Sequence, residues 1–384
     1  MNALSYAFFN AVETGLRGFP IPCRTGLVSI GSPDRDAPVF LTCNYHLTVL
    51  RVKKALQGMN CYLLVANSKG YNVWCGAAGG HFSTHSVVSA LTTSGIQDRV
   101  DHRRVVLPQL AATGVEGREI DRRTGWTALW GPVYAKDIPP YTANAFSKTR
   151  EMRKVRFPLG QRLEMAVMWA FPFSLIASLL TFFLWPDFLL PVNLLLWGVP
   201  LLTFLSFPLY SRGLNPQAKR MERFSAYTVI FDFSKIPLIL WAVFLVGLVT
   251  FGLVANHATW EFMLRWGFAS LLVILIISID LMGSTPLYKS GLHEDRMLKV
   301  QLDVGKCKGA GFCEQVCPRD CYEVDRQRHT ARIPRADLCV QCGACIVQCP
   351  FDALQFVSPG GEILTPETIR KYKLNMIGKR LVRV

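Results

Sequence analysis

The chain has 384 residues, of which 51% are hydrophobic, and its formal net charge is +15 at pH 7. This length exceeds one ordinary core, and the hydrophobic fraction indicates that part of the chain lies in lipid, which excludes a single soluble domain. No nucleic-acid motif accompanies the charge and many basic residues flank apolar runs, so we expect membrane lipid as a partner and no nucleic acid.

Residues 1–160 have the pattern of a soluble α/β domain. Short apolar runs predict strands at 25–31, 38–42 and 61–67, and "HLTVLRVKKALQG" between the last two predicts an amphipathic helix. Ser83 and Thr84 offer a cap for a helix that ends near Gly95. The alternation is typical of βαβ units, whose ligands bind beyond the carboxyl ends of the strands. The first residues lack a basic region before their apolar stretch, so we expect no secretory signal.

The segment "NVWCGAAGG", residues 72–80, follows the third predicted strand. The residues after Cys75 are small, so no bulky side chain covers the backbone there. A chain needs such a backbone where it lies close to a large, flat ligand. Two interpretations of Cys75 compete at this point, a ligand-facing thiolate and a buried structural thiol. A thiol near a helix start has a lowered pKa and is a soft metal ligand. Together with the position of Cys75 beyond a strand end, this favours the interpretation of Cys75 as a ligand-facing thiolate.

Residues 161–284 carry four long apolar runs, each long enough to cross a bilayer of about 30 Å as a helix. We expect spans at 165–185, 188–210, 237–256 and 262–283, with a tight hairpin between the first two. Few ionisable residues lie inside them, which favours an anchor over a transporter. Basic residues precede the first span and follow the second, and an even number of spans then places both soluble parts in the cytoplasm of a multi-pass inner-membrane protein. These residues are Lys148, Arg150, Arg153, Lys154, Arg156 and Arg162, then Arg212, Lys219, Arg220, Arg223 and Lys235.

Residues 285–384 form a cysteine-rich module that holds eight of the twelve cysteines, in cluster spacing that indicates a reducing cytosol. The run "CVQCGACIVQCP" has the C-x2-C-x2-C-x3-C-P spacing of a bacterial ferredoxin. An earlier repeat, "CKGAGFCEQVCP", matches it except that Ala310 stands where the other run has Cys342. We therefore predict an α+β two-cluster ferredoxin domain.

In two-cluster ferredoxins the fourth cysteine of each run binds the other cluster. One [4Fe–4S] cluster is then held by Cys339, Cys342, Cys345 and Cys317. The second has Cys307, Cys313 and Cys349 with a vacancy at Ala310. It is a [3Fe–4S] cluster, a [4Fe–4S] cluster with an open iron, or a cluster completed by Cys321, which is otherwise a small buried hydrophobe. The two interleaved runs provide more cysteines than the four ligands that a tetrahedral zinc site needs, so a zinc site is a weak alternative.

A family resemblance adds to this reading. The motif "NVWCGAAGGHFST" resembles the cap-helix motif of the corrinoid protein of mercury methylation. The order of that family is also followed by "VFLTCNYHLTVLRVKKAL" and "LLVANSKGYNVWC" before the motif and by "VVLPQLAATGV", "WGPVYAKDIP" and "EMRKVRF" after it. That family is related to the corrinoid iron–sulfur protein of acetyl-CoA synthesis. Its ferredoxin partner is a separate chain in most members, whereas here a similar module is fused.

The resemblance implies a Rossmann-like domain that binds cobalamin in its base-off form, with Cys75 as the lower-axial cobalt ligand. A methyl group opposite a strongly donating thiolate leaves as a carbanion equivalent, which suits an acceptor such as Hg(II). The implied partners are a methyl-donor protein or a methyltetrahydrofolate-type donor and a low-potential electron donor, since iron–sulfur clusters can reduce the cobalt. The implied cofactor-binding residues are Thr42, Asn72, Val73, Trp74, Cys75, Gly76, Ala77, Ala78 and Gly79.

We expect structural roles for the other residues that could bind the cobalt. The chain lacks the D-x-H-x-x-G run of histidine-ligated cobalamin enzymes. We therefore expect His81, His85 and His102 at the surface or around the site, and Cys23, Cys43 and Cys61 in the core, with Cys43 placed where the fold could bring it near the corrin.

Two departures from the family bear on the acceptor. The family's motif has a lysine after its alanines and glycine, which is missing here, and no cysteine follows Cys349, although the ferredoxin partner of the family ends in a cysteine pair. Three hypotheses therefore stay open. They are a membrane-anchored corrinoid methyltransferase acting on mercury, the same machinery with another acceptor in a one-carbon or acetyl-CoA-type pathway, and a membrane electron-transfer protein without a corrinoid.

Overall fold

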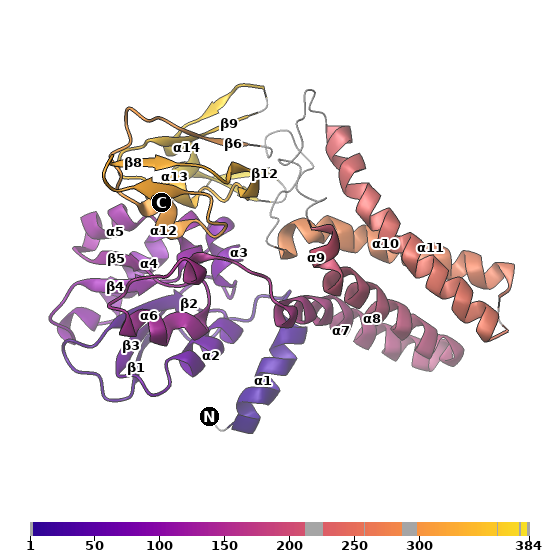
Figure 1. Ribbon diagram of the computed structural model, residues 1–384. Helices are drawn as coiled ribbons and strands as arrows, with labels where there is room; N and C mark the ends of the chain where they lie inside the picture. Colours follow the sequence, from indigo (N-terminus) through magenta and orange to yellow (C-terminus); the bar gives the residue numbers. More distant parts are fainter. Residues whose placement is uncertain are drawn as a thin grey trace. The chain divides into compact units, whose positions relative to one another are not determined.

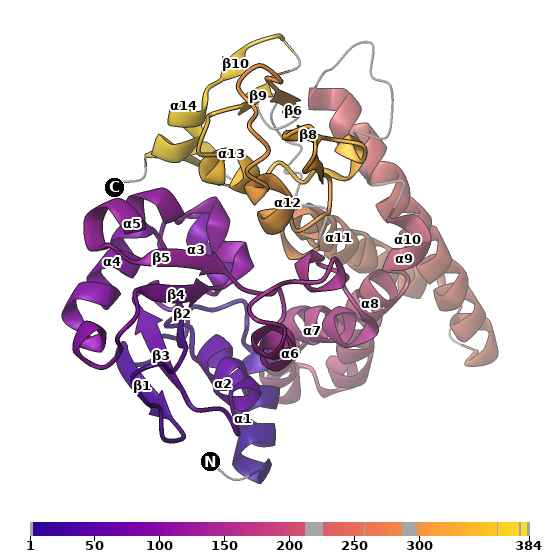
Figure 2. The same cartoon turned by 60° about the vertical axis from the view of Figure 1, so that its left-hand side comes forward.

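A computed structural model describes residues 3–211, 226–256, 258–285, 298–358, 360–375 and 378–381. Contacts divide the chain into two compact units (Figures 1 and 2). One comprises Met1–Asn10, Phe19–Val155 and Leu298–Val384, and the other comprises Ala11–Gly18 and Arg156–Met297. The amino-terminal and carboxy-terminal soluble parts thus fold into one unit. The domain limits expected at residues 160 and 284 stay predictions.

The first unit contains a five-stranded mixed sheet in the order β1-β3-β2-β4-β5. Strands β2 to β5 are parallel, and β1 pairs antiparallel with β3 at one edge. The strands are β1 (Gly26–Ile30), β2 (Val39–Cys43), β3 (Cys61–Ala66), β4 (Arg104–Leu107) and β5 (Thr127–Trp130). The three strands predicted first are therefore confirmed, and the α/β class with them.

Burial explains why these segments form strands. Every residue of β2 and β3 is buried, as expected of central parallel strands covered on both faces, whereas β1 is partly exposed at the edge. The helices of this part are α1 (Ala3–Gly15), α2 (His46–Ala55), α3 (Val73–Ala78), α4 (Thr84–Thr93), α5 (Gly117–Thr124) and α6 (Ile138–Ala143). The predicted helices correspond to α2 and α4, and the latter is followed by Gly95 in the left-handed conformation.

The strand order creates a switch point at β2. The chain passes from β2 through α2 to β3 on one side, and later returns to β4 on the other side of β2. Connections therefore diverge at the carboxyl ends of β2 and β4, which is where open α/β sheets bind ligands. Helix α3 follows β3, and a 3-10 helix, Gln109–Thr113, follows β4 and packs against α3.

The carboxy-terminal part of the same unit has small sheets and short helices. Strands β6 (Lys299–Leu302), β9 (Leu354–Val357) and β10 (Ile363–Leu364) form one sheet. Two hairpins are formed by β7 (Glu323–Asp325) with β8 (Thr330–Arg332) and by β11 (Tyr372–Asn375) with β12 (Gly378–Leu381). The helices are α12 (Phe312–Val316), α13 (Ala344–Gln348) and α14 (Pro366–Lys371).

The second unit is helical and apolar. Helix α7 (Leu159–Leu184) packs against α8 (Leu189–Leu205) after a short 3-10 turn, and α10 (Ala226–Val254) packs against α11 (Trp260–Ser284). A short helix, α9 (Phe207–Tyr210), follows α8. Large apolar side chains face outward; Phe183 is 72% exposed and Leu179 is 62% exposed. Such a surface matches a lipid environment.

Three stretches of the described residues are long and apolar enough to cross a membrane, namely Leu159–Leu184, Pro186–Leu205 and Trp260–Ile277. The fourth span expected, at residues 237–256, corresponds to a shorter apolar segment, Leu238–Val254. The expected basic group at Arg212, Lys219, Arg220 and Arg223 lies outside the described residues, as does the side chain of Lys235. The orientation in the membrane stays a prediction.

Candidate functional site

Cys75 is presented at the carboxyl edge of the sheet by a short, capped helix. Asn72 precedes α3, and its Oδ1 accepts a hydrogen bond from the Cys75 backbone N at 2.8 Å. Its Nδ2 donates to Cys75 Sγ at 3.4 Å. The Cys75 side chain is exposed, so the interpretation of it as a buried structural thiol is wrong. An exposed thiol with an amide donor on its sulfur is arranged to act as a ligand.

The small residues after Cys75 allow two backbones to meet. Gly76 and Ala77 are buried, whereas Val73, Trp74, Ala78 and Gly79 are half-buried. A Cβ on Gly114, just after the 3-10 helix, would lie 2.4 Å from the Ala77 carbonyl oxygen, so the close packing of the two helices requires glycine there. Part of the bare surface predicted to face a ligand therefore packs against the protein, which the sequence did not reveal.

Two buried polar residues that the sequence analysis missed hold the loop before α3. Asn44, just beyond β2, accepts hydrogen bonds through Oδ1 from Ser68 N at 2.8 Å and from Gly70 N at 3.1 Å, and Ser68 Oγ lies 3.0 Å from the same oxygen. Ser68 Oγ in turn donates to the Tyr71 carbonyl at 2.7 Å. A polar residue directly after a buried strand was the available signal. This network fixes the position from which α3 starts.

Thr42 lies on the opposite face of β2 from Cys43. It pairs with Val65, which belongs to the core cluster on the side of α2 and α6, whereas Cys43 belongs to the cluster that contains Ala77. The buried Thr42 Oγ1 has no hydrogen-bond partner of good geometry among the described residues, although it interacts with the neighbouring Cys43 thiol. Such an atom can be satisfied by a bound group at the strand end, so the assignment of Thr42 to cofactor binding stays a prediction.

The remaining thiols and histidines of this domain have structural surroundings. Cys43 and Cys61 are buried, and desolvation raises the pKa of both thiols, that of Cys61 to about 11. Cys43 is fully enclosed rather than open to a ligand. His81 stacks on Tyr71 with ring centroids 4.7 Å apart, His102 Nε2 lies 3.0 Å from the Ala37 carbonyl, and His85 is exposed.

In the carboxy-terminal part, four cysteines from both runs lie near one another. The charges of Cys317 and Cys339 act on the thiols of both Cys342 and Cys345. Burial raises the pKa of the Tyr322 phenol well above its ordinary value, so its OH is a donor, and it lies 3.0 Å from Cys345 Sγ. The set matches the cysteines expected to bind the complete cluster.

Cys321 belongs to this same group. Its backbone N donates to Cys317 Sγ at 3.3 Å, and its thiol interacts with Cys317 and Cys339. The hydrogen bond from the Cys321 thiol lowers the pKa of Cys317 to about 7. The hypothesis that Cys321 completes the other cluster is not supported, because it lies among the ligands of the first.

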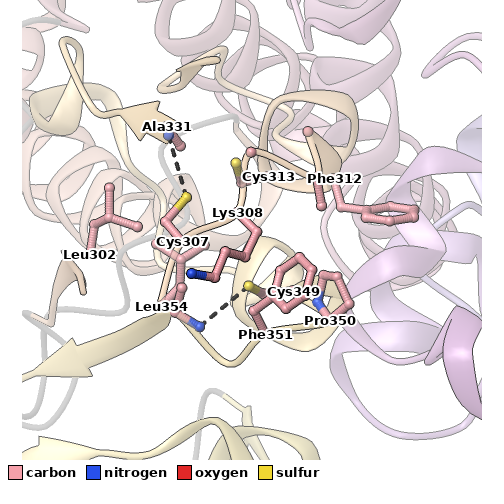
Figure 3. A pocket seen from close by; sticks show the side chains of 14 residues that line it. Leu302, Cys307, Lys308, Phe312, Cys313, Ala331, Cys349, Pro350, Phe351 and Leu354 are labelled. Atoms are coloured by element: carbon pink, nitrogen blue, oxygen red, sulfur yellow. Dashed lines mark hydrogen bonds between the residues drawn. The ribbon is translucent and has the colours of Figure 1, made fainter. Parts of the chain in front are cut away.

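The other three cysteines line a cavity with Ala310, and Figure 3 shows the side chains of these cysteines. Cys307, Cys313 and Cys349 contribute their sulfurs, and burial raises the pKa of Cys313 to about 12. Cys307 Sγ accepts from Ala331 N and Cys349 Sγ from Ala353 N, both at 3.4 Å. Among the described residues no three His, Cys, Asp or Glu side chains are placed to hold a single metal ion. Three thiols that line one cavity are the type of donor that holds an iron–sulfur cluster.

The cysteine-rich part packs directly onto the α/β domain. Val316 of α12 and Ala344 of α13 belong to the core cluster that contains Ala77, and Cys342 packs against that cluster. Gln348 is buried, and its Nε2 donates to the carbonyl oxygens of Ala112 and Val115 at 2.8 and 2.6 Å. Its Oε1 accepts from Gly117 N at 3.2 Å. The helix that carries Cys345 is thus bound to the segment after β4, beside α3.

A second contact between these domains centres on Asp320, whose side chain is 5% exposed. Its carboxylate lies 2.7 Å from Arg150, 3.7 Å from Lys154, 3.9 Å from Arg153 and 3.3 Å from Arg335. Lys148 Nζ donates to the carbonyl of Gln315 at 2.8 Å. Residues 148, 150, 153 and 154, expected to flank a membrane, therefore bind the cysteine-rich domain instead. This weakens the charge argument for orientation.

Tyr322→Phe is expected to lower the reduction potential of the complete cluster by about 40 mV. The phenol donates to a ligand sulfur and so stabilises the more negative, reduced state, and about 1 kcal/mol corresponds to about 40 mV for one electron. A potentiometric titration followed by EPR measures the shift. Tyr62→Phe in the α/β domain, whose OH contacts the Pro33 carbonyl, is the control and should give the wild-type potential. An unchanged potential in Tyr322→Phe would refute the role of this hydrogen bond.

Comparison with known proteins defines the two soluble domains. Residues 14–142 match the family model of the CO dehydrogenase/acetyl-CoA synthase delta subunit, and residues 333–355 match that of the 4Fe-4S binding domain. The chain thus combines a domain similar to the CO dehydrogenase/acetyl-CoA synthase delta subunit with a domain similar to the 4Fe-4S binding domain.

Similar curated proteins are gamma subunits of the acetyl-CoA decarbonylase/synthase complex. That of Methanocaldococcus jannaschii is 34% identical over 131 residues, which are 34% of this chain and 26% of the relative. That of Archaeoglobus fulgidus is 38% identical over 116 residues, which are 30% of this chain and 24% of the relative. The chain therefore spans about a quarter of the length of these relatives.

Proposed function

We propose that this chain is a membrane-anchored, corrinoid-dependent methyltransferase with its own ferredoxin. The observation that carries the proposal is the exposed thiol of Cys75, held by Asn72 on a helix of small residues at the switch point of an α/β sheet. The likeness of residues 14–142 to the CO dehydrogenase/acetyl-CoA synthase delta subunit supports it. So does the packing of a 4Fe-4S binding domain onto the same domain.

The residues present fit a corrinoid. Cys75 offers a soft donor, and Trp74, Ala78 and Gly79 are half-buried beside it. A bound corrinoid supplies a cobalt centre that accepts a methyl group and passes it on. When a corrinoid is bound, the thiolate of Cys75 would serve as a ligand of its cobalt, and the amide of Asn72 would orient that sulfur. Asn44 and Ser68 hold the loop from which α3 starts, so they position the ligand without touching it.

The ferredoxin-type domain provides low-potential electrons. Cysteine thiolates of the complete set hold a [4Fe–4S] cluster, and Tyr322 stabilises its reduced form through Cys345. Cys342, one ligand of that set, packs against the core that also contains Ala77 of α3. Electron transfer within one compact unit needs no encounter between separate chains, because the donor is held at a high effective concentration.

The methyl acceptor that we propose is Hg(II), since a corrinoid that Cys75 ligates through its thiolate would supply a methyl group suited to a thiophilic, electrophilic metal ion. A second candidate is an acceptor of one-carbon or acetyl-CoA-type metabolism. The similarity to gamma subunits of acetyl-CoA decarbonylase/synthase complexes favours this alternative. In either case a methyl-donor protein or a methyltetrahydrofolate-type donor supplies the group. The apolar helices anchor the enzyme in the inner membrane, with both soluble domains on the cytoplasmic side.

Anaerobic reconstitution of the full chain with cobalamin tests the proposal. The wild type is expected to retain a corrinoid whose visible spectrum is that of a base-off, thiolate-ligated form, and Cys75→Ala should retain it with an altered spectrum or lose it. Failure of the wild type to retain any corrinoid would leave a membrane electron-transfer protein. Formation of methylmercury by the loaded wild type and not by Cys75→Ala would favour Hg(II) over the second candidate.

A further inference from the structure

The two cysteine runs have nearly the same backbone, although only one has its fourth cysteine. Gly309 and Gly311 have φ of 68° and 81°, and the residues that correspond to them, Gln341 and Gly343, have φ of 56° and 74°. Each run then continues into a five-residue helix, α12 or α13. The helices end alike, since Cys317 has φ −69° and ψ 114° and Cys349 has φ −70° and ψ 116°. Ala310 therefore occupies the backbone position that carries Cys342 in the other run.

The loop around Ala310 is kept in this shape by contacts of its own. A Cβ on Gly309 would lie 2.6 Å from the backbone of His329, so the left-handed residue there must be glycine. Cys307 Sγ is fixed by the Ala331 amide on the same hairpin. The site thus retains the geometry of a four-cysteine loop and lacks only one sulfur.

The same correspondence explains why Cys321 does not supply the missing sulfur. Cys321 and Ala353 occupy matching places, four residues after Cys317 and Cys349, and each donates its backbone N to the sulfur of that cysteine. Ala353 lines the cavity with Ala310, whereas Cys321 lies with Cys317 and Cys339. The extra thiol is therefore on the wrong side of the pseudo-symmetric domain.

The position that lacks the fourth cysteine is exposed to solvent. Ala310 and Lys308 are exposed, whereas Cys313 is buried and Cys307 and Cys349 are half-buried. Both residues line the cavity with the three cysteines, and Figure 3 shows Lys308 beside these cysteines. The family model of the 4Fe-4S binding domain matches residues 333–355 and so contains the complete run.

We infer that the cavity of Cys307, Cys313 and Cys349 binds a cluster with an exchangeable corner at Ala310, a site for a Fe²⁺ ion that no protein thiolate holds. A one-electron oxidant such as ferricyanide converts [4Fe–4S]²⁺ into [3Fe–4S]⁺, and Fe²⁺ leaves as the electron passes to the oxidant. In the reverse direction a one-electron reductant forms [3Fe–4S]⁰, which takes up Fe²⁺ to restore [4Fe–4S]²⁺. The inference rests on the iron–sulfur part of the proposed function and is independent of the corrinoid.

EPR spectroscopy of the full chain, purified anaerobically and then treated with ferricyanide, tests the inference. We expect the signal of an oxidised three-iron cluster in stoichiometric amount, its loss after dithionite and Fe²⁺ are added, and its return on reoxidation. In Ala310→Cys the signal should be absent, because the loop already has the backbone for a fourth ligand. Two four-iron clusters, measured by iron content and by EPR of the reduced protein, would show that this variant is folded and loaded.

Cys321→Ala separates the inference from completion of the cluster by Cys321. We expect the same three-iron signal as in wild type, whereas a signal that appears only in this variant would mean that Cys321 is the fourth ligand. A wild type that resists ferricyanide as Ala310→Cys does would also overturn the inference. None of these readouts depends on corrinoid, so a chain that fails to bind cobalamin can still give the three-iron signal.

Discussion

Cys75→Ala is expected to lower the rate of methyl transfer by more than about 100-fold, since removal of residues that merely orient a metal ligand already costs about 10- to 100-fold. The thiolate is the proposed donor to the metal, and the other thiols of the α/β domain are not placed to replace it, because Cys43 and Cys61 are buried and Cys23 packs beside the other core cluster. Alanine is a strong helix former at an exposed position of α3, so the fold should survive. The rate is measured with the corrinoid-loaded full chain and a supplied acceptor.

Asn72→Ala should give a smaller loss, of about 10- to 100-fold, because it leaves the sulfur in place and removes its amide donor and the helix cap. Cys23→Ala is the matched control, a half-buried thiol of the same domain that packs beside the other core cluster, and should keep the wild-type rate. Wild-type methyl transfer by Cys75→Ala would contradict the assignment of the ligand.

Asp320→Ala should loosen the contact between the ferredoxin-type domain and the α/β domain. The loss of a buried, paired charge costs about 3–5 kcal/mol, and we expect the lower part of this range because Arg150 and Lys154 are reached by solvent. The cost arises because Arg153 and Arg335, which are 15% and 26% exposed, each lose one of two carboxylates and keep only Glu314 and Glu323, respectively. Electron transfer from the clusters to the corrinoid should slow as docking weakens.

Hydrogen exchange of the full chain measures this loosening. The amide of Val155 donates to the Pro318 carbonyl and that of Gly117 donates to Gln348, so both report on the contact. We expect faster exchange at both in Asp320→Ala. Glu323→Gln is the control, because Glu323 binds the same Arg335 at 2.6 Å but is 58% exposed, and such pairs contribute about 0.2–1 kcal/mol. Equal exchange in both variants would mean that Asp320 does not hold the domains together.

Much of the local structure could be predicted because it depends on short-range patterns. Continuous apolar runs gave β2 and β3, periodicity gave α2, and cysteine spacing gave the two interleaved sets. The antiparallel pairing of β1 was not foreseen, because an edge strand can pair in either direction without changing its own pattern. The six-residue helix α3 was indicated only by family resemblance, since its glycine and alanines have no hydrophobic periodicity.

The residues that position the sites were harder to find. Asn44 and Ser68 are common polar residues whose hydrogen bonds join segments 24 residues apart, and their places after buried strands do not identify these partners. Basic residues at 148–154 fit a membrane-flanking role by sequence, yet they bind Asp320 and Gln315. A charge pattern does not identify its partner, because attraction between opposite charges depends on distance in space and not along the chain.

By itself the sequence determined which residues can carry the chemistry, namely one thiol in a segment of small residues and seven cluster thiols in two interleaved runs. It also indicated apolar helices that hold the chain at a membrane. The tertiary structure alone decided how these residues are grouped. It placed Cys321 with the complete set, left Ala310 at an open corner, and bound α13 to the segment beside α3 through Gln348. The physical reason is that the type of ligand a residue can provide follows from its covalent structure. Which residues lie together follows from packing between distant segments, and Gln348 and Ala112 are more than 200 residues apart.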